Sequence, residues 1–272
     1  MDHLNKLIKL ALKEDIGRGD ITSDATISAF AIVSAKIVAK ENLVPAGTDI
    51  AKLVFKAVDK KIRIKIKIRD GRFVKKGTVL AELKGRARSL LAAERTALNF
   101  LQHLSGIATL TRKFATRVKG TGGKILDTRK TLPGYRFLEK YAVRMGGGAN
   151  HRMGLYDAYL IKNNHIAIAG SVAFAISAAR ESGYAKKVEV EVRNFSELKE
   201  ALAGGADVIM LDNFSPKMAT MAKAMIGRMA KIEVSGGINL SNVRRFAKAG
   251  VDFISVGAIT HSAPAADIHM II

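Results

Sequence analysis

Hydrophobic residues in the C-terminal half of the chain fall into short runs, and each run ends on polar residues. The runs close on DTRKT (127–131), LIKNNH (160–165), VEVEV (188–192), LDN (211–213), SGG (235–237) and VGAIT (256–260). Helical spacing follows the strands around 135–145, 171–181, 196–203, 216–226 and 240–248. This alternation predicts a parallel α/β barrel of the TIM type, complete or incomplete, with the active site at the carboxyl ends of its strands. Six strands are visible, and a further one is expected between 104 and 124 or in the tail.

The N-terminal part of the chain follows a different pattern. Helical spacing over residues 4–12 gives way, between 32 and 83, to short alternating strands with turn signals between them. Helical spacing returns over 89–119, with a break expected near Ser105-Gly106. We therefore predict a small α+β domain over residues 1–105 and a barrel domain over 106–264. The apolar tail, 265–272, is expected to pack on the first domain.

The composition narrows the class of protein. A chain of 272 residues with 48% hydrophobic content can bury a large core. Because it contains no cysteine, disulfides, thiolate nucleophiles and Cys-based zinc sites are excluded. The longest uncharged apolar stretch, 166–179, is too short to span a bilayer, and the lysine-interrupted amino terminus is unlike a signal peptide. A cytoplasmic protein with no membrane segment is expected.

The formal net charge of +21 raises the question of nucleic-acid binding. Part of this charge lies in KKIRIKIKIRD (60–70), which alternates isoleucine with lysine or arginine. That alternation is typical of a strand with one face in the core and one in water. The run has no aromatic residue, and the chain has no tryptophan to stack on bases. No specific nucleic-acid partner is expected.

Two glycine-containing turns follow late, neighbouring strands of the predicted barrel. They consist of Ser235, Gly236 and Gly237, and of Val256, Gly257 and Ala258. Glycines let backbone N–H groups approach an anion, and the start of the next helix adds a favourable dipole. Either turn alone is more often a plain tight turn, but two on adjacent late strands favour a phosphate site.

Basic residues gather at the ends of three other predicted strands. Arg129 and Lys130 follow the first strand, His151 and Arg152 follow a triple glycine, and Lys162 ends the next strand. Scattered surface charge is the usual explanation for any one of them. Three consecutive elements with cations at one barrel end favour a substrate with several negative charges, since arginine binds both oxygens of a carboxylate.

Acidic residues occupy the following two strands. Glu189 and Glu191 share one face of VEVEV, opposite the valines, and Asp212 closes the next strand. Inward carboxylates are costly unless they meet a metal, a cation or substrate hydroxyls. Contact with hydroxyls or magnesium is one interpretation, and a salt bridge to Lys162 or Arg129 is the other.

Ordered blocks over nearly the whole chain resemble the quinolinate phosphoribosyltransferase family. They are EDIGRGDITSDATI (14–27), ERTALNFLQHLSGIAT (94–109), DTRKTLPGYRFLEKYAVRMGGGANHR (127–152), LIKNNHI (160–166), EVEVRNFSEL (189–198), ADVIMLDNF (206–214), EVSGGI (233–238) and GVDFISVGAITHSAPAADI (250–268). Asn163 and Arg193 depart from the family, which often has acidic residues there. The resemblance implies an α/β barrel with an N-terminal open sandwich, and a homodimer, or a higher oligomer, in which each site borrows residues from its neighbour.

The resemblance also implies a reaction, which is a step of NAD biosynthesis. Quinolinate and phosphoribosyl pyrophosphate would give nicotinate mononucleotide, pyrophosphate and carbon dioxide, with Mg²⁺. Related phosphoribosyltransferases that act on nicotinate or another aromatic acid remain the nearest alternative. A Schiff-base aldolase using Lys162 and a basic nucleic-acid-binding protein are the other two.

Residue roles follow from the same resemblance. Arg129, His151, Arg152 and Lys162 would hold the quinolinate carboxylates, with Arg95 reaching in from the partner subunit. Lys130 would face phosphate groups, Glu191 and Asp212 would meet ribose hydroxyls or water-bound magnesium, and the two glycine turns would take the 5′-phosphate. Lys130, Lys162, Glu191 and Asp212 are the residues expected to take part in catalysis.

Overall fold

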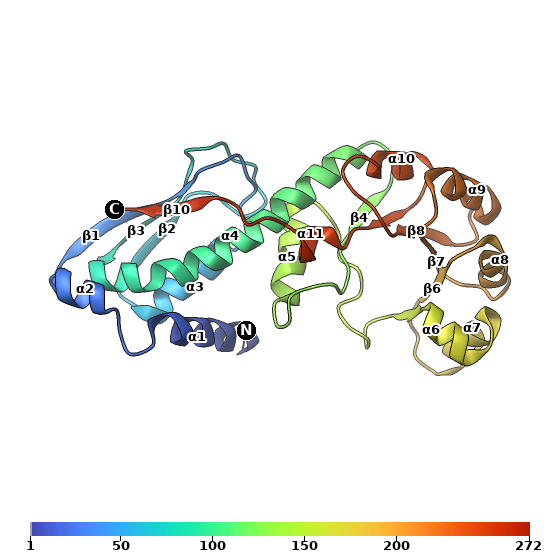
Figure 1. Ribbon diagram of the computed structural model, residues 1–272, viewed down its shortest axis with the longest axis horizontal. Coiled ribbons are helices and arrows are strands. Elements are labelled where there is room, and N and C mark those ends of the chain that lie inside the picture. The colour runs from blue at the N-terminus through green and yellow to red at the C-terminus, as the bar shows by residue number, and fades with distance from the viewer. Residues whose placement is uncertain (1) are drawn as a thin grey trace. The chain divides into compact units, whose positions relative to one another are not determined.

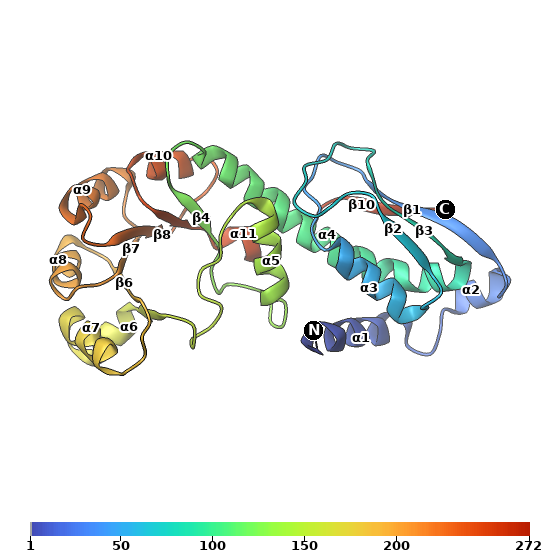
Figure 2. The same cartoon turned by 180° about the vertical axis from the view of Figure 1, so that it is seen from behind.

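The computed structural model describes residues 2–272 and divides into two compact units, seen from opposite sides in Figures 1 and 2. The first unit contains the chain up to Leu110 together with Pro133–Gly147 and Ala263–Ile272. The second contains Thr111–Leu132 and Gly148–Ser262. The domain boundary at 105/106 stays a prediction. No helix within residues 2–272 has the length and apolar character that crossing a membrane requires.

The first unit is built on a four-stranded antiparallel sheet. Its strands are β1 (Ile32–Ala39), β2 (Arg63–Ile66), β3 (Val79–Arg86) and β10 (Ile268–Ile271), in the order β10-β1-β3-β2. The tail strand β10 pairs with β1 in the register Val38↔His269. The same unit contains α1 (Asp2–Ile16), α2 (Ile21–Thr26), α3 (Thr48–Val58) and α5 (Arg136–Gly146). Leu80 of β3, Ile62 before β2 and Phe55 of α3 lie in its core.

Helix α3 departs from the sequence prediction, which expected only strands between 32 and 83. Its amino end has no cap from its own side chains. The Asp70 carboxylate, 22 positions later, accepts from the backbone N–H of Thr48 at 3.2 Å and from its hydroxyl at 2.7 Å. It also accepts from the Gly47 N–H at 2.6 Å. Because the cap comes from a distant residue, the local sequence contains no start signal for this helix.

Helix α4 (Ala87–Val118) runs for 32 residues without interruption, so the break expected near Ser105-Gly106 is wrong. Ser105 is fully buried, and its hydroxyl accepts from the backbone N–H of Ala46 at 3.1 Å. Gly106 faces the backbone of the tail segment, where a Cβ atom would lie 2.0 Å from the carbonyl oxygen of Pro264. The glycine therefore permits close packing of two backbone segments and does not end the helix.

The second unit contains a six-stranded, fully parallel sheet, as the sequence predicts. Its strands are β4 (Lys124–Leu126), β5 (Tyr159–Ile161), β6 (Val188–Val192), β7 (Val208–Asp212), β8 (Lys231–Ser235) and β9 (Phe253–Ser255), in the order β4-β9-β8-β7-β6-β5. This is the strand order of an α/β barrel. Within residues 2–272 the edge strands β4 and β5 do not pair, so the barrel is open there, with a single bridge between Leu126 and Ala149.

Helices alternate with these strands (Figure 2). They are α6 (Asn163–Ala169), α7 (Val172–Glu181), α8 (Phe195–Ala203), α9 (Pro216–Ile226), α10 (Val243–Lys248) and the short α11 (Ala258–His261). Asn194 and Ser215 cap α8 and α9 with their side chains, each at the start of a predicted helix. The further barrel strand is not found in the described residues, because the segment 104–118 belongs to α4 and the tail strand joins the other sheet.

Strand β6 is buried at every position, including Glu189 and Glu191. Ile209, Ile232 and Ile254 on the next three strands are completely buried and form the centre of the core. Because all six strands run parallel, their carboxyl ends meet at one edge of the sheet. The polar residues that close each hydrophobic run are therefore brought to the same edge.

Replacement of Gly106 by alanine is expected to destabilise the protein. In an ordinary helix this change stabilises by about 0.4–1 kcal/mol, because it restricts the unfolded chain. Here the added methyl group overlaps the Pro264 carbonyl, and overpacking of this kind costs about 1–3 kcal/mol. Thermal melts of Gly106→Ala and of the control Asn99→Ala, an exposed position on the same helix, measure the difference. A Gly106→Ala protein as stable as the wild type would contradict the packing argument.

Candidate active site

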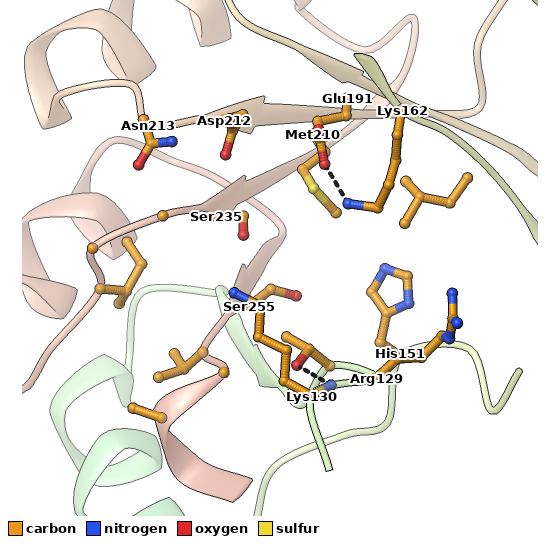
Figure 3. A pocket seen from close by; sticks show the side chains of 18 of the residues that line it. Arg129, Lys130, His151, Lys162, Glu191, Met210, Asp212, Asn213, Ser235 and Ser255 are labelled. Atoms are coloured by element: carbon orange, nitrogen blue, oxygen red, sulfur yellow. Dashed lines mark hydrogen bonds and ion pairs between the residues drawn. The ribbon is translucent and has the colours of Figure 1, made fainter. Parts of the chain in front are cut away.

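A cavity of about 730 Å³ lies at the carboxyl ends of the parallel strands (Figure 3). All residues that line it belong to the second unit. They are Thr128, Arg129, Lys130, His151, Arg152, Leu160, Lys162, Glu191, Met210, Asp212, Asn213, Ser235, Gly236, Gly237, Ile238, Ser255, Val256, Gly257, Ala258 and His261.

The cavity brings together the candidate site residues named from the sequence, except Arg95 and Glu189. The basic residues come from the segments around β4 and β5, the two acids from the ends of β6 and β7, and the glycine turns from β8 and β9. Arg95 lies exposed on α4 and forms no hydrogen bond or ion pair with the described residues. The strand-end residues therefore lie around one cavity, while their membership of a functional site and their individual roles stay predictions.

Arg152 is the most buried cation of the cavity, with 8% of its surface exposed. One guanidinium nitrogen donates to the carbonyl of Ala158 at 2.9 Å, whereas its buried Nε has no partner in the described part of the chain. Burial lowers the pKa of Arg152, the charge of Arg129 lowers it further, and Glu189 opposes the shift. A buried guanidinium with an unused N–H donor is suited to bind an anion that enters the cavity.

Lys162 and Glu191, from the ends of the adjacent strands β5 and β6, form an ion pair with 2.6 Å between Nζ and Oε2 (Figure 3). Glu191 is nearly buried and Lys162 is half exposed, with side-chain exposures of 11% and 46%. The sequence offered a salt bridge to Lys162 as one interpretation of the inward carboxylates, and this contact exists. A ligand that bound either side chain directly would have to compete with its partner.

The turn after β8 is shaped by close backbone contacts. Gly236 and Gly237 have φ angles of +97° and +61°, a region that favours glycine. A Cβ atom on Gly236 would lie 2.1 Å from Oδ1 of Asn213. Asn213 itself has φ +58°, the one positive value outside glycine in residues 2–272, and its N–H donates to the Ser235 carbonyl at 2.9 Å. The Asn213 segment and the Gly236 turn therefore hold each other in place.

Two buried carboxylates, Glu189 and Glu233, lie close to His151, which lines the cavity. Nε2 of His151 is 3.1 Å from Oε2 of Glu189 and 3.6 Å from Oε1 of Glu233. One ligand atom from each lies within 4.8 Å of the others, the spacing of a possible metal site. Burial and the neighbouring Glu189 charge raise the pKa of Glu233 to about 8. Ser255 donates to its Oε1 at 2.5 Å.

Sequence reasoning missed several residues of this region. Glu233, Ser255, Asn213 and Met210 were not singled out. Glu233 carried a usable signal, because a carboxylate in the middle of the buried strand KIEVS needs a partner. No sequence signal pointed to Asn213, because its positive φ and its contact with Gly236 depend on how two strand ends meet.

Comparison with known proteins covers almost the whole chain. The family model "Quinolinate phosphoribosyl transferase, N-terminal domain" matches residues 20–105, and "Quinolinate phosphoribosyl transferase, C-terminal domain" matches 107–271. A relative from Bacillus subtilis (strain 168), named probable nicotinate-nucleotide pyrophosphorylase [carboxylating], is 45% identical over 99% of this chain and 94% of its own. A chloroplastic nicotinate-nucleotide pyrophosphorylase [carboxylating] from Arabidopsis thaliana is 41% identical over 98% of this chain and 82% of its own.

Solved structures agree with these matches. The nicotinate-nucleotide pyrophosphorylase of Francisella tularensis superposes with a TM-score of 0.96 at 45% identity, over 99% of this chain and 95% of that one. The α/β fold with a parallel sheet and a separate N-terminal sheet is thus shared with a relative. Both halves of the chain match, and the cavity residues expected from the resemblance lie together: the chain belongs to the quinolinate phosphoribosyl transferase family.

Proposed function

We propose that this protein transfers the phosphoribosyl group of phosphoribosyl pyrophosphate to quinolinate, with loss of carbon dioxide, to form nicotinate mononucleotide and pyrophosphate in NAD biosynthesis. The relatives that cover the chain are named for this activity. One observation carries the proposal: a single cavity combines a cationic side with glycine turns suited to phosphate. The two sides match a dicarboxylate and a phosphorylated sugar.

The cationic side would bind quinolinate. Arg129, Arg152 and Lys162 provide positive charge around one part of the cavity, and His151 lies among them. Arginine and lysine bind carboxylates through charge-assisted hydrogen bonds, which are about twice as strong as neutral ones. The unused Nε donor of Arg152 is available for one of these bonds. To bind a carboxylate, Lys162 would exchange part of its contact with Glu191 for the substrate.

The glycine turns would hold the 5′-phosphate of the donor. Ser235, Gly236 and Gly237 form one turn, and the Val256–Ala258 segment leads into α11. At Gly236 and Gly237, no side chain separates the backbone of the first turn from the cavity, so its N–H groups are accessible to a phosphate. Lys130, whose side chain packs against Gly257, adds a positive charge for the phosphate groups.

The chemistry requires no nucleophilic side chain. The lone pair of the pyridine nitrogen forms a bond to the anomeric carbon of ribose while the bond to pyrophosphate breaks. The protein positions the two reactants and stabilises the charge that develops on the ribose and on the leaving pyrophosphate. When carbon dioxide leaves, the electron pair stays on the ring carbon beside the positive nitrogen, and that carbon then takes up a proton.

Magnesium would accompany phosphoribosyl pyrophosphate. The carboxylates of Glu191 and Asp212 lie on neighbouring strand ends at the cavity and are the hard oxygen donors that Mg²⁺ favours. The ion would neutralise the leaving pyrophosphate. We propose that the two acids meet ribose hydroxyls directly and the ion only through water. A cytoplasmic location remains the prediction made from the sequence.

Turnover assays with quinolinate and with nicotinate test the reaction, with release of carbon dioxide measured in both. The proposal expects nucleotide and carbon dioxide from quinolinate. Comparable turnover of nicotinate, without carbon dioxide, would assign the protein to the related phosphoribosyltransferases that use a monocarboxylate.

Replacement of Arg152 by alanine is expected to weaken quinolinate binding. One charge-assisted hydrogen bond is worth about 1.5–3 kcal/mol, which corresponds to a loss of about ten- to a hundredfold in kcat/KM. Because Arg152 is buried, Arg152→Lys serves as a second variant that keeps the charge and loses the planar fork. Arg180→Ala, which removes an exposed ion pair with Asp207 outside the cavity, is the control. Unchanged quinolinate kinetics in both Arg152 variants would refute the assignment.

Replacement of Gly236 by alanine is expected to impair use of phosphoribosyl pyrophosphate more than binding of quinolinate. The new methyl group would meet Asn213 and displace the turn that faces the phosphate. Gly205→Ala is a matched control, since Gly205 also has a positive φ, of +72°, but lies outside the cavity. Equal KM values for the phosphoribosyl donor in Gly236→Ala and wild type would remove this turn from the site.

We further propose a homodimer in which Arg95 completes the site of the neighbouring subunit. Arg95 is exposed and forms no hydrogen bond or ion pair with the described residues, as expected of a residue that acts on another chain. Arg95→Ala and Lys162→Ala homodimers should both be nearly inactive. A mixed dimer should regain one of its two sites, because each subunit supplies the residue that the other lacks. Heterodimers that form but stay as inactive as the single variants would contradict the shared site.

A further inference from the structure

Two carboxylates, Glu189 and Glu233, are buried side by side with the ring of His151 at the wall of the cavity. Glu189 lies on β6 and Glu233 on β8, with exposures of 8% and 1%. Burying two carboxylates so close together is costly unless a proton or a cation compensates one of them. The proposed reaction assigns neither glutamate a role.

The hydrogen bonds of the His151 ring define where its proton lies. Nδ1 accepts from the backbone N–H of Arg152 at 2.7 Å, so this nitrogen carries no proton. Nε2 lies 3.1 Å from Oε2 of Glu189 and is left as the donor. Both ring nitrogens are thereby engaged by the protein. A doubly protonated ring would turn Nδ1–H against the N–H donor of Arg152.

Glu233 completes the arrangement from the other side of the ring. Ser255, itself buried, donates to Oε1 of Glu233 at 2.5 Å. Burial and the neighbouring Glu189 charge raise the pKa of Glu233 to about 8, and the charge of His151 opposes this shift. The raised pKa favours the uncharged acid of Glu233, which can donate to the Glu189 carboxylate. The negative charge of Glu189 in turn favours the His151 Nε2–H donor.

We propose that Glu189 and Glu233 are a pair of positioning residues that hold His151 as an uncharged ring, protonated at Nε2, at the wall of the substrate cavity. The inference rests on the proposed function for its consequence: arginine and lysine alone supply the positive charge that meets the quinolinate carboxylates. His151 instead fixes the backbone of Arg152 through Nδ1 and so helps to place the Arg152 guanidinium.

The cations around His151 favour an uncharged ring, and the Glu189 carboxylate opposes their effect. Asp127 accepts from the backbone N–H of His151 at 2.9 Å. This contact fixes the main chain and does not involve the ring nitrogens. Arg129, Arg152 and Lys162 line the same cavity, and their positive charges disfavour a further cation among them. A ring that bound a metal through Nε2 would carry its proton on Nδ1, but Nδ1 accepts from the backbone N–H of Arg152, which favours a proton at Nε2.

The first test is the protonation state of His151 in the wild-type protein. Long-range ¹H–¹⁵N NMR of protein labelled with ¹⁵N-histidine distinguishes the two neutral tautomers from the doubly protonated ring. His151→Gln assigns the signals by their loss. We expect, at pH 7 and without substrate, one protonated nitrogen at Nε2. A doubly protonated ring, or a proton at Nδ1, would overturn the inference.

Three variants then separate positioning from simple packing. Glu233→Gln keeps the volume and can still donate to Glu189, so it should retain kcat/KM for quinolinate within about threefold and keep the Nε2–H signal. Glu233→Met loses the hydrogen bond from Ser255 and the proposed donation to Glu189, and Glu189→Gln loses the charged acceptor. Each should lower kcat/KM for quinolinate by about ten- to a hundredfold, the usual effect of removing a partner that orients a site residue. KM for phosphoribosyl pyrophosphate should change little.

Glu181→Gln, an exposed glutamate on α7, is the control. If Glu233→Gln is as damaged as Glu233→Met, Glu233 acts as a charge and the proposed arrangement is wrong. If Glu189→Gln leaves quinolinate kinetics and the His151 signals unchanged, Glu189 does not position the ring. Should Glu233→Met fail to fold, the other two variants and the wild-type spectrum still decide. Lack of quinolinate turnover by the wild type would refute the proposed function and leave the NMR result standing.

Discussion

Compensation of buried charge at one end of the parallel sheet is the constraint on which the site depends. Strands β6 and β8 place glutamates in the barrel interior, and the segments after β4 and β5 bring arginine and lysine to the same edge. An unpaired charge there would cost several kcal/mol, so each must meet a counter-charge, a hydrogen bond or a proton. Lys162 forms an ion pair with Glu191, His151 contacts Glu189, and Ser255 donates to Glu233, whose pKa is raised by burial and by the Glu189 charge.

This compensation is incomplete on the cationic side, and the imbalance is what suits the cavity to its proposed substrates. Arg152 is buried with an unused donor, and its pKa is lowered because burial and Arg129 both disfavour its charge. A dianionic ligand would supply the missing negative charge. The uncompensated positive charge therefore favours binding of a ligand that carries negative charge.

Close approach of backbone to backbone is the second requirement, and it explains two glycines that differ in conformation. Gly106 is helical and leaves room for the tail, which passes where its Cβ would lie. Gly236 has a positive φ and leaves room for the Asn213 side chain. The first glycine serves the packing of the N-terminal unit. The second keeps the turn at the cavity free of side-chain atoms, as the proposed phosphate contact requires.

The sequence by itself determined the strand-and-helix alternation, the edge at which polar residues gather, the two glycine turns and the family. These features are local: hydrophobic periodicity and a strand end occupy a few consecutive residues, and parallel strands need no further information to bring their carboxyl ends together. For this reason the strand-end pattern alone identifies cavity residues such as Lys162, Asp212 and Gly236.

Only the tertiary structure decided the cap of α3, the continuity of α4 and the cluster of His151, Glu189 and Glu233. Asp70 lies 22 positions from the helix it caps, Gly106 meets a residue of the tail, and His151 meets carboxylates from two later strands. Each depends on atoms that are distant along the chain and adjacent only after folding. Local periodicity does not encode such contacts, because a buried polar group finds its partner through packing and not through spacing in the sequence.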